Sequence, residues 1–107
     1  MKTTYNKLVR DHIPQIIQSD GKTCTCRVLS DDEYLVKLDE KLNEELAEYQ
    51  QDKTMEELAD LLEVIHAVIK ARGSTWEQVE AMRAAKAQKH GGFEKRILLL
   101  ETESVSN

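Results

Sequence analysis

Two helix-start signals place much of this chain in a pair of consecutive helices. Ser30-Asp-Asp-Glu33 and Thr54-Met-Glu-Glu57 each have a hydroxyl residue followed three positions later by glutamate, the pattern of a capping box. Apolar residues recur at helical spacing after each signal, which predicts helices over about 31–51 and 55–71, the second ended by Gly73. Because the link between them is only about residues 51–53, we expect an antiparallel hairpin.

Two acid-Leu-Ala-acid units lie on this hairpin, Glu45-Leu-Ala-Glu48 and Glu57-Leu-Ala-Asp60. Side chains three positions apart share a helix face, so each unit places two carboxylates side by side. Helical phase puts the first acid of each unit within the apolar stripe and the second at its edge. Four carboxylates on facing helices are hard to tolerate without a cation, and we therefore predict a metal site.

A simpler interpretation exists for some of these acids. Glu57 is the third residue of its helix and is also placed to hydrogen-bond back to the cap residue. The remaining acids of the stretch are expected to be solvated: Glu44, Glu56 and Glu63.

Composition narrows the fold and the class of partner. Among 107 residues, Pro occurs once and Gly four times, so helix breakers are few and one all-α domain over residues 1–107 is predicted. Residues 31–63 carry thirteen Asp or Glu against three Lys, whereas residues 83–96 carry five Lys or Arg against one Glu. This asymmetry argues against duplex nucleic acid and fits a cation together with an anionic ligand, although solubility alone would also explain it.

Location and redox chemistry are predicted from what the sequence lacks. The N-terminal residues have no apolar signal core, and no apolar run approaches membrane-spanning length, so a cytoplasmic protein without membrane contact is expected. Cys24 and Cys26 form one isolated pair, which does not favour a structural zinc site.

Flanking elements are predicted on either side of the hairpin. Asp11 is a possible cap for a short helix with Pro14 in its first turn, ended by Gly21. A further helix over about 75–90 is closed by Gly91-Gly92, with a basic stripe that a solvated face would also explain. Residues near 24–28 and 96–100 have the composition of a short β ribbon. His66 lies opposite the acids and is expected to be a packing or surface residue.

With these motifs in place, the chain resembles the all-α nucleotide pyrophosphohydrolases, the MazG-like and phosphoribosyl-ATP pyrophosphohydrolase-like superfamily. The family pattern Glu-Glu-x-x-Glu followed by Glu-x-x-Asp stands here as Glu44-Glu45-Leu-Ala-Glu48 and Glu57-Leu-Ala-Asp60. The flanking segments, Tyr5-Asn-Lys-Leu-Val-Arg-Asp-His-Ile-Pro14 and Lys89-His-Gly-Gly-Phe-Glu-Lys-Arg96, are similar to one branch of that group. The resemblance covers about residues 5–100.

The resemblance implies a four-helix fold of the MazG-like type and hydrolysis of a nucleoside triphosphate between its α- and β-phosphates. It implies a homodimer or homotetramer, and Mg²⁺, with Mn²⁺ as a substitute. The implied catalytic and metal-binding residues are Glu45, Glu48, Glu57 and Asp60. The implied phosphate-binding residues are Lys7, Arg10, Lys89 and Arg96, of which the first two are equally compatible with ordinary surface charge.

Three points stay open at the level of the sequence. The substrate could be phosphoribosyl-ATP instead of a nucleoside triphosphate, and a non-catalytic helical oligomerisation or binding module is the alternative from another class. The acid pairs are closer in sequence than in many relatives, so a tight turn could displace one ligand. Which carboxylate would act as the base is not assigned.

Overall fold

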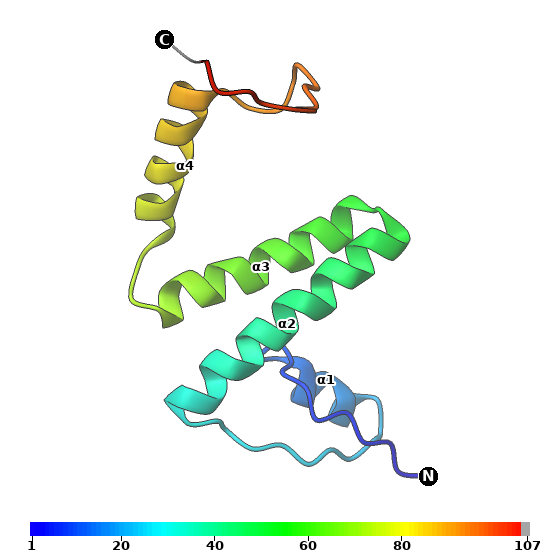
Figure 1. Ribbon diagram of the computed structural model, residues 1–107. Helices are drawn as coiled ribbons and strands as arrows, with labels where there is room; N and C mark the ends of the chain where they lie inside the picture. The colour runs from blue at the N-terminus through cyan, green and yellow to red at the C-terminus, as the bar shows by residue number, and fades with distance from the viewer. Residues whose placement is uncertain (106–107) are drawn as a thin grey trace. The chain divides into compact units, whose positions relative to one another are not determined.

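The computed structural model describes residues 1–105, and all regular secondary structure in that part of the chain is helical. Its helices are α1 (Ile13–Ser19), α2 (Asp31–Asp52), α3 (Met55–Ala71) and α4 (Trp76–His90) (Figure 1). The prediction of an all-α protein is therefore confirmed. No helix among the described residues is both long enough and apolar enough to cross a membrane.

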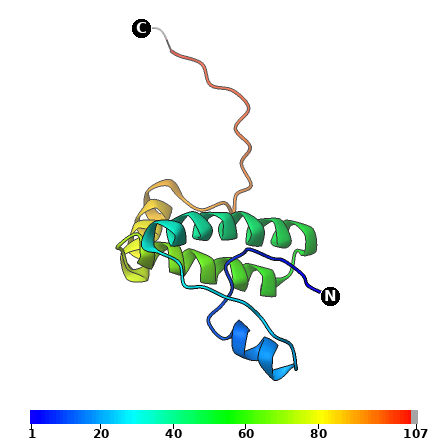
Figure 2. The ribbon, with the colours of Figure 1, turned by 90° about the horizontal axis from the view of Figure 1, so that it is seen from below.

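The hairpin of α2 and α3 carries the site, and local signals explain its boundaries. The Ser30 hydroxyl accepts from the Glu33 N–H while the Glu33 carboxylate accepts from the Ser30 N–H, which makes a complete capping box. Lys53 has a left-handed backbone (φ 60°) that ends α2 and turns the chain. The two helices then run antiparallel and contact each other; Figure 1 shows them joined at the turn and diverging toward their other ends, and Figure 2 shows them side by side.

The chain divides into two compact units, Met1–Trp76 and Glu77–Asn107. The first holds α1 and the hairpin, and its buried side chains are Leu38, Glu45 and Val64. The second holds the rest of α4 and the segment after it. One domain over residues 1–107 stays a prediction.

The short β ribbon is a prediction that the structure overturns. Neither residues 24–28 nor residues 96–100 contain a strand. Arg96 has a φ of 58°, outside the β region, and Val28 and Leu98 are 97% and 80% exposed. A lone ribbon needs an apolar face packed against something, and these segments have none in the described chain.

The cap of the short helix α1 is also not the predicted one. Its N-cap is His12 instead of Asp11, and no side chain caps it. The Ile13 N–H donates to the Arg10 carbonyl (3.0 Å), so a backbone turn starts the helix. Pro14 lies in the first turn as expected, because that position needs no amide donor.

Candidate metal centre

Carboxylates from α2 and α3 meet near the closed end of the hairpin. The chain crosses from one helix to the other in two residues, Lys53 and Thr54, so the last turns of α2 lie beside the first turns of α3. Two groups of carboxylate oxygens lie within 4.8 Å of one another: Glu44 with Glu45 and Glu48, and Glu45 with Glu57 and Asp60. Glu45 belongs to both groups.

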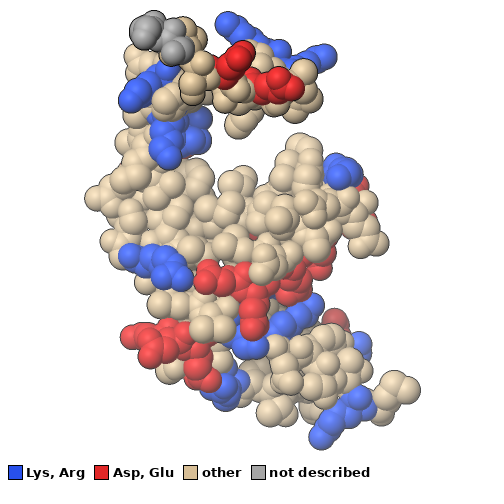
Figure 3. Space-filling model, viewed as in Figure 1, with Lys and Arg blue, Asp and Glu red and all other residues tan. Residues whose placement is uncertain are grey.

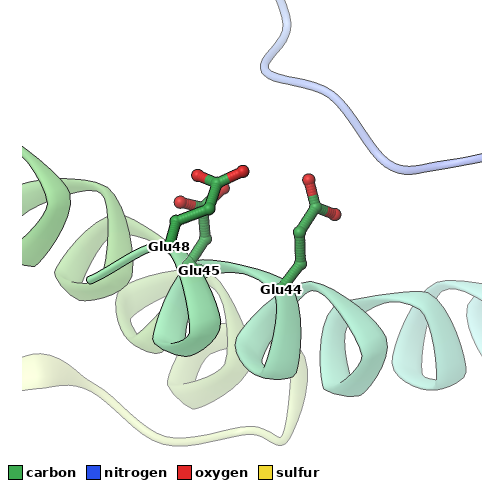
Figure 4. A group of neighbouring side chains, drawn as sticks. All are labelled: Glu44, Glu45 and Glu48. Atoms are coloured by element: carbon green, nitrogen blue, oxygen red, sulfur yellow. The ribbon is translucent and has the colours of Figure 1, made fainter. Parts of the chain in front are cut away.

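The α2 members of this cluster project together. Figure 4 shows Glu44, Glu45 and Glu48 on one side of α2, pointing toward the side on which the N-terminal segment runs. Figure 3 shows acidic side chains gathered below α3, with basic side chains beside them. All four predicted ligands therefore lie in one region, and Glu45 is the residue common to its two halves.

Glu45 and Glu57 are the members of the cluster that have a buried oxygen without a hydrogen-bond partner among the described residues. Glu45 is only 7% exposed, which confirms the prediction from helical phase that it lies within the apolar stripe. Glu45 Oε2 and Glu57 Oε2 are both buried, and neither has a hydrogen-bond partner in the described chain. A buried oxygen without a donor carries its full desolvation cost. These two oxygens would therefore be stabilised by a cation or a donor, which the described residues do not supply.

Burial and neighbouring negative charges raise the pKa values of Glu45 and Glu57. Burial raises the pKa of Glu45, the nearby Glu48 charge adds to that rise, and Lys41 opposes it. Burial also raises the pKa of Glu57, and the charges of Asp52, Asp60 and Glu45 reinforce the effect. A divalent cation would favour the charged forms of both groups.

The alternative role of Glu57 as a capping residue is only half realised. Its N–H donates to Thr54 Oγ1 (3.2 Å), so the backbone of Glu57 takes part in the cap. Its side chain instead leaves Oε2 buried and unpaired beside Glu45. Glu57 can therefore take part in the cap and in the acid cluster at the same time, because the cap uses its backbone N–H and the cluster uses its carboxylate.

Basic side chains border the cluster, and two of them were predicted as phosphate contacts. Lys7 Nζ donates to Glu44 Oε1 (3.1 Å), and Arg10 donates to Asp60 Oδ1 (2.8 Å). Lys37 Nζ donates to the Asn6 carbonyl (3.4 Å), which also holds the N-terminal segment beside α2. Lys7 and Arg10 therefore lie close enough to the acid cluster to contact an anion that binds there together with a cation.

Lys41 is a member of the site that sequence reasoning missed. Its Nζ lies 3.2 Å from Glu44 Oε1 and 3.3 Å from Glu45 Oε1, and its side chain is 16% exposed. The spacing of three and four residues to these acids was the available signal. Lys41 pairs with Oε1 of Glu45, whereas Glu45 Oε2 is buried and has no partner among the described residues.

Glu44 is less solvated than predicted. It is half-buried and accepts hydrogen bonds from Lys7 and Lys41, which lower its pKa against the opposing effect of burial. Helical phase depends on one helix alone and does not predict that Lys7, from the N-terminal segment, contacts Glu44. Glu56 and Glu63 are exposed, as predicted.

The other basic candidates belong to the second unit. Lys89 is in the last turn of α4, and Arg96 follows it in an exposed segment. Their role as phosphate contacts stays a prediction. His66 stacks on Trp76 with ring centroids 3.9 Å apart and planes 12° apart, so it packs against an aromatic ring as expected.

The donor set fits a hard divalent cation. Mg²⁺ and Mn²⁺ prefer carboxylate oxygens, and the cluster offers them from two rigid helices. The two buried oxygens without donors are the specific observation in favour of that fit, because an ordinary solvated acidic face would leave its oxygens in water.

No protein-family model matches the chain, and no solved structure matches it. The chain is similar to an uncharacterized protein of Mycolicibacterium smegmatis, with 57% identity over 42 residues. That match spans 39% of this chain and 43% of the relative's length, so the resemblance to the nucleotide pyrophosphohydrolases stays a prediction from the motifs.

Proposed function

We propose that the chain is a divalent-cation-dependent nucleotide pyrophosphohydrolase that cleaves a nucleoside triphosphate into a monophosphate and pyrophosphate. The observation that carries the proposal is the pair of buried oxygens without donors, Glu45 Oε2 and Glu57 Oε2, which come from different helices and lie in one cluster with Asp60. A cation there and a basic border suit a ligand with several phosphates.

Each group has a role in this proposal. Glu45, Glu48, Glu57 and Asp60 would hold the cation with their carboxylate oxygens. The cation would supply positive charge to the phosphate oxygens and would make a water molecule more acidic. Lys7 and Arg10, now 3.1 and 2.8 Å from acids of the cluster, donate to phosphate oxygens of the substrate. One of the four carboxylates accepts the proton of the attacking water.

The test is release of pyrophosphate from a panel of canonical, deoxy and modified nucleoside triphosphates, with phosphoribosyl-ATP included. Glu57→Gln should lower the rate at least about a hundredfold, the range for loss of a group acting in the transition state, and should weaken Mn²⁺ binding in calorimetry. Glu56→Gln is the matched control, because Glu56 is the adjacent exposed acid of the same helix. Absence of both pyrophosphate release and Mn²⁺ binding in the wild type would refute the proposal.

A homodimer or homotetramer is part of the same proposal. Apolar side chains of the hairpin remain exposed, including Met55 (69%), Leu62 (47%) and Leu46 (42%). Exposed apolar surface of this kind is typical of an interface. Sedimentation equilibrium tests it, and a monomer at micromolar concentration would contradict it.

A further inference from the structure

A second feature of the first unit is a cavity of about 980 Å³ at the open end of the hairpin. Its walls come from the start of α2, the second half of α3 and residues 74–76. This volume is at the upper end of the range for small-molecule sites, roughly 300–1,000 Å³. The cavity therefore has room for a ligand the size of a nucleoside.

One lining residue of the cavity lies close to the acid cluster along α3. Glu63 lines the cavity and lies three residues after Asp60, about 4.5 Å further along the axis of α3. Asp11 also lines it and directly follows Arg10, whose guanidinium is 2.8 Å from Asp60. A ligand with its phosphates at the cluster can therefore extend its other end toward the cavity.

The lining combines flat rings with hydrogen-bond acceptors. Tyr34, His66 and Trp76 line it, with the His66 and Trp76 rings parallel and 3.9 Å apart, so the lining includes aromatic rings of the kind on which planar ligands stack. The charged side chains of the lining are three acids and one lysine: Asp11, Asp31, Glu63 and Lys70. Acceptors therefore outnumber charged donors three to one.

We propose that this cavity binds the nucleobase of the substrate and prefers bases with an exocyclic amino group. A carboxylate accepts from the amino group of cytosine but faces only a carbonyl at the same position of uracil. Stacking on aromatic rings tolerates any base, so the acids provide the discrimination. The assignment of the nucleobase as part of a substrate rests on the proposed function, whereas binding of the base does not require hydrolysis.

The experiment uses free nucleosides, which carry no phosphate and need no metal. Trp76 is the one tryptophan of the chain and lines the cavity, so its fluorescence reports occupancy directly. Cytidine should bind at least about fivefold more tightly than uridine, with calorimetry repeating the comparison because nucleosides absorb ultraviolet light. Glu63→Gln and Asp31→Asn should each reduce that preference, and Glu56→Gln, an exposed acid of α3 outside the cavity, should leave it unchanged.

The outcomes separate this inference from the proposed function. Glu57→Gln should keep the preference for cytidine while its Mn²⁺ binding is weakened. Equal binding of uridine and cytidine, or binding of neither, would overturn the inference whatever the pyrophosphate assay shows. A preference for cytidine in a protein that neither releases pyrophosphate nor binds Mn²⁺ would overturn the proposed function alone.

Discussion

Replacing Glu45 with methionine should make the protein more stable without metal and less stable with it. Methionine has nearly the volume of glutamate and no oxygens to desolvate. In the wild type, Glu45 is 7% exposed and its Oε2 has no donor. A cation bound to that oxygen would make it stabilising. The variant should therefore be the more stable protein without metal, and the wild type the more stable protein with metal.

The size of the effect follows from the contacts. A buried acceptor without a donor costs about 1–3 kcal/mol, and removing it returns that amount. The variant loses the ion pair to Lys41 at 3.3 Å, worth about 1 kcal/mol or less. Lys41 keeps Glu44 at 3.2 Å, so no buried charge is left alone. The net gain is about 1 kcal/mol, or roughly 4–8 °C in Tm for a domain of this size.

Urea unfolding in the presence of a chelator, and again with Mn²⁺, measures the free energy of unfolding without and with metal. Mn²⁺ at a hundredfold its Kd should stabilise the wild type by about 2.7 kcal/mol and the variant hardly at all, so the order of stability reverses. Glu56→Met is the control, with a change within about 0.5 kcal/mol in either condition, since Glu56 is exposed. If Glu45→Met is destabilised by more than about 1 kcal/mol in chelator, the argument from the unpaired oxygen is wrong.

Three further predictions concern the cap and the basic border. Ser30→Ala removes the acceptor of the α2 cap and should lower the free energy of unfolding by about 1 kcal/mol in urea titrations. Arg27 and the Ser30 N–H hold the pKa of Glu33 at about 2, below its ordinary 4.5. Its stabilising contribution is therefore present above pH 4.5 and lost as pH falls through 2, so the urea midpoints of wild type and Glu33→Gln should converge over that range. Lys7→Met and Arg10→Met should each raise KM for the nucleotide roughly tenfold, as for loss of a charged hydrogen bond, without weakening Mn²⁺ binding in calorimetry.

Local signals predicted the hairpin well because they determine where its helices begin and end. A hydroxyl cap fixed the start of each helix, and the observed bounds, Asp31–Asp52 and Met55–Ala71, lie within one residue of the predicted ones. Burial of Glu45 was also predictable, because helical phase depends on one helix alone.

The errors arose where distant segments or weak local preferences decide the outcome. The half-buried state of Glu44 depends on Lys7, which is far away in sequence and covers it. The β ribbon failed because alternation over a few residues does not provide a packing partner, and Arg96 adopts a φ of 58° at the start of one segment. The cap at Asp11 failed because a backbone turn at Arg10 already started α1.

The short link between the acid units was expected to risk displacing a ligand. The structure instead shows that the acids of the cluster differ in how far hydrogen bonds satisfy them. On the α2 side, Glu44 is already satisfied by hydrogen bonds from Lys7 and Lys41. Between the helices, Glu45 and Glu57 retain one unpaired buried oxygen each. Among the described residues, the buried carboxylate oxygens without a hydrogen-bond partner therefore come from both α2 and α3. A cation is expected to bind near them, with Glu45, the residue common to both groups of carboxylates, among its ligands.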